Sequence, residues 1–181
     1  IHLGQMNTPV ARNRIEGLHN TDNLKLNQNF FKDKVCIDIG CGSAAAGTVN
    51  LLNMGAKFVH LCDVDESFIE PASNILNSNP NFKNRWGPKV GNALSLPYDS
   101  ESMDFALCQG VLHHLYDDTD ALKEIYRVLK YGGKAHLSLV GYGGLIGKFV
   151  MKTMRDEYQE NETFKSFMDN NLDVDSFKSI I

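Results

Sequence analysis

The fold is decided by one stretch in the first third of the chain, Val35-Cys36-Ile37-Asp38-Ile39-Gly40-Cys41-Gly42-Ser43-Ala44-Ala45. Its first five residues form a short and largely apolar run, which is typical of a strand buried on both faces of a parallel sheet. The two glycines permit a tight turn. Apolar residues at helical spacing then continue to Met54, and Gly55 follows as a stop. The stretch therefore predicts a strand, a glycine turn and a helix over residues 45–54.

The same alternation of strands and helices continues through the middle of the chain. Short apolar runs predict four further strands, at residues 58–62, 88–90, 103–108 and 135–140. Helical spacing predicts helices over residues 67–77 and 119–130. The first of these begins with a capping box formed by Ser67 and Glu70, and the second is ended by Gly132-Gly133. This alternation predicts an α/β domain with a parallel sheet.

The composition is that of an ordinary globular domain. The 181 residues are 43% hydrophobic, which is enough to bury a core without disulfides or metals. A net charge of −4 has the wrong sign for a nucleic-acid-binding domain that works through bulk charge. No signal peptide and no run of about 18 apolar residues is evident, so we expect a soluble, cytoplasmic protein without membrane insertion. The 4 cysteines form no Cys-x-x-Cys pair, so we expect free thiols and no metal site.

The glycine turn is compatible with two classes of cofactor. Gly40-x-Gly42-x-x-Ala45 fits the fingerprint of dinucleotide-binding domains, with its permitted final alanine. Asp38 opposes that interpretation, because at about 4 Å and an effective dielectric near 20 a carboxylate and a pyrophosphate repel by roughly 4 kcal/mol. The same carboxylate attracts a cation, and S-adenosylmethionine carries an ammonium group and a sulfonium but no phosphate. The residues favour S-adenosylmethionine, with a nicotinamide-dependent oxidoreductase as the alternative.

A second carboxylate follows the next predicted strand. Asp63 comes directly after residues 58–62, at the carboxyl end of that strand. In α/β folds of this kind, an acidic side chain at that point can accept hydrogen bonds from ribose hydroxyls. Asp63 therefore predicts a nucleoside site without choosing between the two cofactor classes.

Six motifs lie in order along the chain, at residues 35–43, 62–64, 90–98, 102–106, 110–115 and 122–134. Together they resemble the successive motifs of class I S-adenosylmethionine-dependent methyltransferases, and especially those of the ubiquinone/menaquinone-methyltransferase-like branch. The resemblance implies a Rossmann-like, doubly wound parallel sheet of strand order 3-2-1-4-5. It also implies two further strands after the fifth, and we expect these C-terminal strands to be missing from this chain.

The resemblance further implies which residues contact the cofactor. They are Asp38, Gly40, Cys41, Gly42, Asp63, Val64, Asn92, Ala93 and Gln109. Three positions depart from the family pattern, since Ala44 replaces a usual glycine, Asn92 a usual aspartate and Tyr131 a usual proline. Asn92 retains a side-chain carbonyl that can accept a hydrogen bond from the adenine amino group. We therefore expect the cofactor site to be retained.

The methyl acceptor is less constrained than the cofactor. Methyl transfer from a sulfonium is an in-line displacement for which the protein supplies alignment, and a general base is needed only where the acceptor must lose a proton. His113 is the candidate base, although a structural role is the stronger interpretation. Tyr142 and Arg14 are candidate contacts of a small-molecule acceptor. Glu124 and Arg127 stand three residues apart on a helix and are expected to pair with each other.

These assignments divide the chain into three parts. Residues 1–34 are expected to form a helical lead-in, residues 35–141 the S-adenosylmethionine-binding core, and residues 142–181 a helical lid with its C-terminal portion absent. The sequence predicts a methyltransferase acting on a small molecule, without a nucleic-acid partner, and leaves its oligomeric state open. The non-enzymatic alternative is a binding subunit that keeps the cofactor fold.

Overall fold

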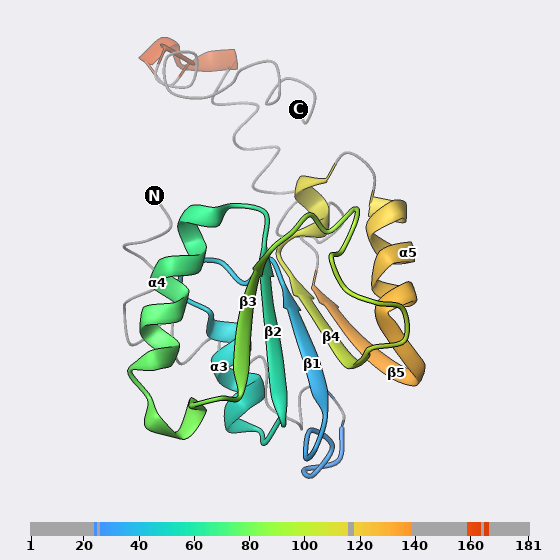
Figure 1. The fold of residues 1–181 in the computed structure, drawn as a ribbon. Coiled ribbons are helices and arrows are strands. Elements are labelled where there is room, and N and C mark those ends of the chain that lie inside the picture. The colour runs from blue at the N-terminus through green and yellow to red at the C-terminus, as the bar shows by residue number, and fades with distance from the viewer. Residues whose placement is uncertain (1–23, 25, 116–117, 139–158, 164, 167–181) are drawn as a thin grey trace. The chain divides into compact units, whose positions relative to one another are not determined.

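A computed structural model describes residues 24, 26–115, 118–138, 159–163 and 165–166 of the chain. In the described part of residues 1–139, a 5-stranded parallel sheet has the order β3-β2-β1-β4-β5 (Figure 1). The strands are β1 (Val35–Ile39), β2 (Phe58–Asp63), β3 (Trp86–Val90), β4 (Met103–Gln109) and β5 (Leu129–Ser138). This order confirms the predicted doubly wound sheet, because the chain leaves β1 toward β2 and β3 and then crosses back to β4 and β5.

The described helices cover both faces of the sheet. α3 (Ala46–Asn53) and α4 (Glu66–Asn77) pack on one face, and α5 (Asp118–Val128) packs on the other. Short 3₁₀ turns, η1 (Pro80–Phe82) and η2 (Leu112–His114), follow α4 and β4. Because side chains alternate between the faces of a strand, the central strands are apolar on both sides. The first face carries Cys36, Val59, Leu61, Phe105 and Leu107, and the second carries Ile37, Ile39, Cys62, Met103, Ala106 and Cys108.

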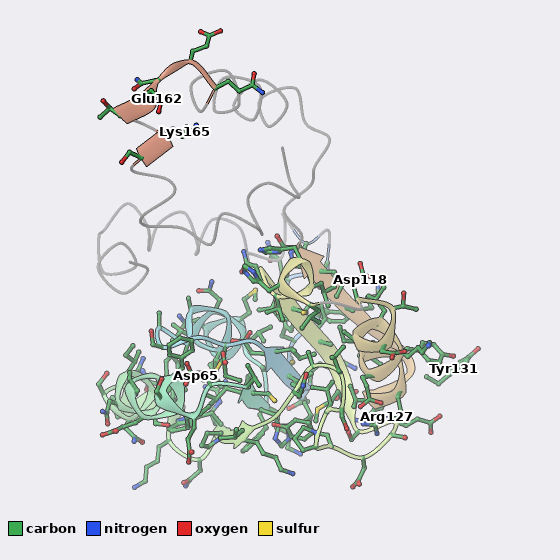
Figure 2. The ribbon with its side chains drawn as sticks, turned by 90° about the horizontal axis from the view of Figure 1, so that it is seen from above. Asp65, Asp118, Arg127, Tyr131, Glu162 and Lys165 are labelled. Carbon is green, nitrogen blue, oxygen red and sulfur yellow. The ribbon has the colours of Figure 1, made fainter. Side chains whose placement is uncertain are left out.

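The start of α4 differs from the predicted capping box. The helix begins at Glu66, and its N-cap residue is Asp65, whose Oδ1 accepts a hydrogen bond from the Ser67 N–H at 2.9 Å (Figure 2). Ser67 is therefore inside the helix, and the prediction that it forms a capping box with Glu70 is wrong. Asp65 is the better cap because its carboxylate also faces the positive end of the helix dipole.

The end of α5 also differs from the prediction. The helix ends at Val128, and β5 begins at Leu129. The prediction that Gly132-Gly133 ends the helix is wrong, since both glycines lie inside β5. Gly132 has a φ of +76° and the register between β4 and β5 shifts in this region, so the glycines accommodate a local irregularity in the strand. The predicted strand residues 139–140 lie outside the described residues.

The outer segments of the chain are described in part. In residues 1–34 the described residues form turns, and Phe31 is fully buried there, with its ring centroid 5.0 Å from that of Phe105. Residues 140–181 form a second compact unit, in which the described residues include short helical stretches at 159–160, 162–163 and 165–166. The helical lead-in and the helical lid stay predictions.

A group of polar contacts fixes the loop between β3 and β4 to α5. The Glu124 carboxylate accepts a hydrogen bond from the Leu96 N–H at 2.7 Å. The Arg127 guanidinium donates to the carbonyl oxygens of Leu96 and Tyr98, at 2.9 and 2.8 Å. Arg127 also pairs with both oxygens of Glu124, at 2.7 and 2.8 Å, which confirms the predicted pairing. Figure 2 shows Arg127 on α5, with the exposed Tyr131 projecting away from the domain.

Replacing Arg127 with lysine keeps the charge and removes the planar set of donors that reaches two carbonyls and a carboxylate at once. We expect R127K to lower the free energy of unfolding by about 1–3 kcal/mol, because partly buried acceptors lose their donors. Urea denaturation followed by circular dichroism measures the change. The matched control is K123R, at an exposed ion pair with Asp120, which should change stability by less than about 0.5 kcal/mol. Equal losses in the two variants would contradict a specific role for Arg127.

Candidate functional site

A cavity of about 360 Å³ lies at the carboxyl ends of the central strands. These strand ends are at the top of the sheet in Figure 1. Its described lining comes from the turns after β1, β2, β3 and β4, and consists of Ile39, Gly40, Gly42, Asp63, Val64, Phe68, Gly91, Asn92, Ala93, Gly110, Val111, His114 and Leu115. Ligands of open α/β sheets bind at this end, where the strand order reverses. A larger depression of about 530 Å³ lies beside Lys83 and Trp86, away from the predicted residues.

The turn after β1 requires glycine at both predicted positions. Gly40 has a φ of +70° and Gly42 a φ of +59°, which is backbone that favours glycine. A Cβ on Gly40 would also overlap the side chain of Val111. The N–H groups of Gly40 and Cys41 donate to the carbonyl of Cys62, at 2.8 and 3.2 Å, so the turn is tied to the end of β2. At the two glycines, backbone atoms without side chains thus line the cavity.

Asp63 joins this turn to the one that follows β2. Its Oδ2 accepts a hydrogen bond from the Gly42 N–H at 2.9 Å, and its Oδ1 accepts one from the Asp65 N–H at 3.0 Å. The residue is only 7% exposed, yet it lines the cavity. Each carboxylate oxygen has a further lone pair, so Asp63 can also accept hydrogen bonds from a ligand.

Asp38 lies behind the cavity lining, with its carboxylate turned toward α3. It is 4% exposed, and it accepts hydrogen bonds from the hydroxyl of Thr48, at 2.8 Å, and from the Thr48 N–H. Burial raises the pKa of Asp38 to about 6, and the charge of Asp63 adds to that rise, while the two hydrogen bonds from Thr48 oppose it. A direct contact between Asp38 and the cofactor stays a prediction.

The other predicted cofactor residues divide into two groups. Val64, Asn92 and Ala93 line the cavity, whereas Cys41 and Gln109 are absent from its described lining. The Asn92 Oδ1 accepts a hydrogen bond from the Leu94 N–H at 2.9 Å, which holds the turn after β3. Burial raises the pKa of the Cys41 thiol, so this side chain is protonated at neutral pH.

The histidine pair after β4 places its second member at the cavity. His114 is part of the lining, whereas His113, the predicted candidate base, is not. The two rings lie 4.0 Å apart, and the Nδ1 of His113 is buried without a hydrogen-bond partner. Burial and the neighbouring His114 lower the pKa of His113, which is therefore neutral at neutral pH. Tyr142 and Arg14, the predicted acceptor contacts, lie outside the described residues.

Several lining residues were missed by the sequence analysis. Phe68 lies in the first turns of α4, and Val111 and Leu115 adjoin η2. Their positions just after β2 and β4 could have indicated them, because those strand ends meet at the cavity. Ala44, the departure from the family glycine, is absent from the described lining.

The described residues contain no group of three or more His, Cys, Asp or Glu side chains arranged to hold a metal ion. None of the helices among them is long and apolar enough to cross a bilayer. The cysteines at positions 36, 41, 62 and 108 are free and buried, as predicted. Burial raises the pKa of Cys62 to about 11 and that of Cys108 to about 12, so these thiols are protonated packing groups.

Comparison with known families matches residues 37–137 to the family described as "Methyltransferase domain". The matched segment runs from the middle of β1 into β5 and contains the entire described cavity lining. It covers more than half of the chain.

Individual relatives agree with this assignment. An uncharacterised methyltransferase of Schizosaccharomyces pombe is 38% identical over 101 residues, which cover 56% of this chain and 37% of that protein. A demethylmenaquinone methyltransferase of Oceanobacillus iheyensis is 30% identical over 94 residues, or 42% of this chain and 40% of that protein.

Solved structures have the same fold. A SAM-dependent methyltransferase of Methanosarcina mazei is 28% identical and superimposes with a TM-score of 0.60, over 71% of this chain and 62% of that one. The chain spans well under half the length of the two curated relatives described above. It belongs to the family of S-adenosylmethionine-dependent methyltransferase domains.

Proposed function

We propose that the protein binds S-adenosylmethionine in the cavity at the strand ends and transfers its methyl group to a small-molecule acceptor. The observation that carries this proposal is a cavity with two buried carboxylates and no cationic side chain in its described lining, since Asp63 lines it beside the glycine turn and Asp38 lies behind it. The family assignment agrees with it.

The charge of the cavity supports S-adenosylmethionine over a dinucleotide. Asp63 lines the cavity and Asp38 lies just behind it, and no lysine or arginine is present in its described lining. Such a site repels a pyrophosphate and attracts the ammonium and sulfonium of S-adenosylmethionine. The nicotinamide alternative would place two phosphates at the end of the sheet that carries these carboxylates.

The residues of the cavity fit the parts of this cofactor. In this proposal Asp63 accepts hydrogen bonds from the ribose hydroxyls, and Asn92 and Ala93 contact the adenine. Val64, Phe68 and Leu115 supply an apolar lining that excludes water from the base. S-adenosylmethionine, when bound, supplies a methyl group already activated by a sulfonium. The protein therefore has to align the acceptor and to exclude water.

His114 is placed to take a proton from the acceptor. His114 belongs to the cavity lining, whereas the ring of His113 lies beside that of His114 and is neutral at neutral pH. A base is required for acceptors that lose a proton on methylation. His113 then acts by packing against His114 and fixing its position.

Two observations support assigning the protein to the ubiquinone/menaquinone-methyltransferase-like branch. They are the resemblance of its motifs and its similarity to the bacterial relative named as a demethylmenaquinone methyltransferase. That similarity covers 42% of this chain and 40% of that protein, and it supports a small apolar molecule as the class of acceptor. A reducing compartment such as the cytoplasm fits the free, buried thiols.

Binding of S-adenosylhomocysteine, the product that S-adenosylmethionine leaves after methyl transfer, tests the proposed cofactor. At 100 times its Kd, a ligand stabilises the folded state by about 2.7 kcal/mol, which for a domain of this size raises Tm by roughly 5–10 °C. We expect that shift with S-adenosylhomocysteine and no shift with NAD or NADP, as measured by differential scanning fluorimetry. A shift with the dinucleotides alone would sink the proposal.

Substitution of the two histidines tests the proposed proton acceptor. With an acceptor found by screening with labelled S-adenosylmethionine, H114Q should lower kcat by about 100-fold or more near neutral pH, since a positioned base contributes that much. Affinity for S-adenosylhomocysteine should stay within about twofold. The matched variant H113Q should lose less activity. A larger loss in H113Q than in H114Q would assign the base to His113 instead.

A further inference from the structure

Asp38 and α3 are held together by contacts that lie behind the cavity lining. The Asp38 Oδ2 accepts a hydrogen bond from the Thr48 hydroxyl at 2.8 Å, and Thr48 is 0% exposed. Gly47 lets the carboxylate come this close, since a Cβ there would lie 2.7 and 2.8 Å from the two Asp38 oxygens. A Cβ there would also lie 2.6 Å from the Leu107 Cδ2. A glycine inside a helix is costly, so its presence is explained by the close approach of Leu107 and Asp38 together.

These contacts also complete the start of α3. The N-cap residue of the helix is Ala45, which has a φ of 46° and provides no side-chain cap. The first N–H groups of a helix need acceptors, and the Asp38 carboxylate serves the Thr48 N–H from a neighbouring strand. Its charge also lies at the positive end of the helix dipole. Asp38 therefore links β1, which precedes the glycine turn, to the start of α3, which follows it.

The neighbours of Asp38 have opposing effects on whether its carboxyl group is ionised. Burial and the carboxylate of Asp63 favour the neutral acid. The thiols that interact with it, on Cys41, Cys62 and Cys108, have raised pKa values and carry no charge. Thr48 supplies the donors that favour the carboxylate.

We propose that Thr48 is a positioning residue, which keeps Asp38 ionised and directed at the start of α3 and thereby sets the lower pH limit of cofactor binding. The inference rests on the proposed function, because the ionised Asp38 matters as the counter-charge to the cationic end of the cofactor. Protonation of Asp38 removes that charge and weakens the anchor of the glycine turn.

The loss of binding at low pH is distinct from unfolding. The pKa of Asp38 in the folded protein, about 6, lies above its ordinary value of 3.8. The folded state thus binds this proton more tightly than the unfolded state, and the contribution of Asp38 to stability rises as the pH falls through 6. Binding should therefore decline while the domain stays folded.

The test is the pH dependence of the Kd for S-adenosylhomocysteine, measured by calorimetry between about pH 5 and about pH 8. For the full chain we expect the affinity to fall about tenfold per pH unit below pH 6. T48V should move this midpoint upward by about one pH unit and leave the affinity near pH 8 within about twofold, because only the hydroxyl donor is lost. T48S, which keeps a hydroxyl, should behave as the unmodified protein.

Three further measurements make the result decisive. D38N should bind more weakly throughout and show no acid midpoint near pH 6. G47A, which displaces the carboxylate, should shift the midpoint in the same direction as T48V. The carboxyl ¹³C resonance of Asp38 in the ligand-free protein should titrate near pH 6.

Two results would overturn the inference. A midpoint that T48V leaves unchanged in a protein that binds S-adenosylhomocysteine, or titration of Asp38 near pH 4, would refute the role of Thr48 and leave the proposed function intact. Absence of S-adenosylhomocysteine binding at every pH, with a normal thermal unfolding transition, would refute the proposed function and this inference together.

Discussion

The site depends on one carboxylate that serves two turns. Asp63 accepts the N–H of Gly42 with one oxygen and the N–H of Asp65 with the other, so the turn after β1 and the turn after β2 have a fixed separation. Without Asp63 both backbone donors would lose their acceptor within the protein, so the link between the two turns through these N–H groups depends on this carboxylate. The same residue lines the cavity and retains lone pairs for a ligand. Asp63 therefore fixes the turns and, in the proposed function, also binds the ligand.

The other walls are fixed from outside the cavity. Arg127 and Glu124 on α5 hold the loop after β3 through its backbone at Leu96 and Tyr98, which positions the preceding turn at Asn92. Asp38 and Thr48 fix the start of α3 on the opposite face of the sheet. The first set of contacts joins α5 to the loop after β3, and the second joins α3 to β1. The cavity is thus preformed by polar contacts, while apolar packing on both faces of the sheet supplies the stability beneath it.

Backbone-level features were predictable from the sequence, because they depend on local patterns. The apolar runs predicted the strands, and the glycines at positions 40 and 42 predicted a turn that in fact requires positive φ. The directions of the side chains were harder to predict from the sequence. The sequence could not show that the Asp38 carboxylate faces Thr48, or that His114 and not its neighbour lines the cavity, since both follow from how β1 and η2 pack. The start of β5 at Leu129 was not predicted, because a glycine pair such as Gly132-Gly133 is typical of the end of a helix. Here the pair lies within a strand that is paired to β4.

The central claim is that the Asp63 carboxylate holds the cofactor as well as the turns, and the most direct measurement is the affinity for S-adenosylhomocysteine of D63N beside that of D65N. Each substitution removes one negative charge, and the two positions are only two residues apart. Asp65, however, is an exposed N-cap residue that asparagine can replace. The account predicts that D63N binds at least about tenfold more weakly, through loss of charge-assisted hydrogen bonds, and that D65N stays within about twofold of the unmodified protein. Equal affinities in D63N and the unmodified protein, with both folded, would contradict it.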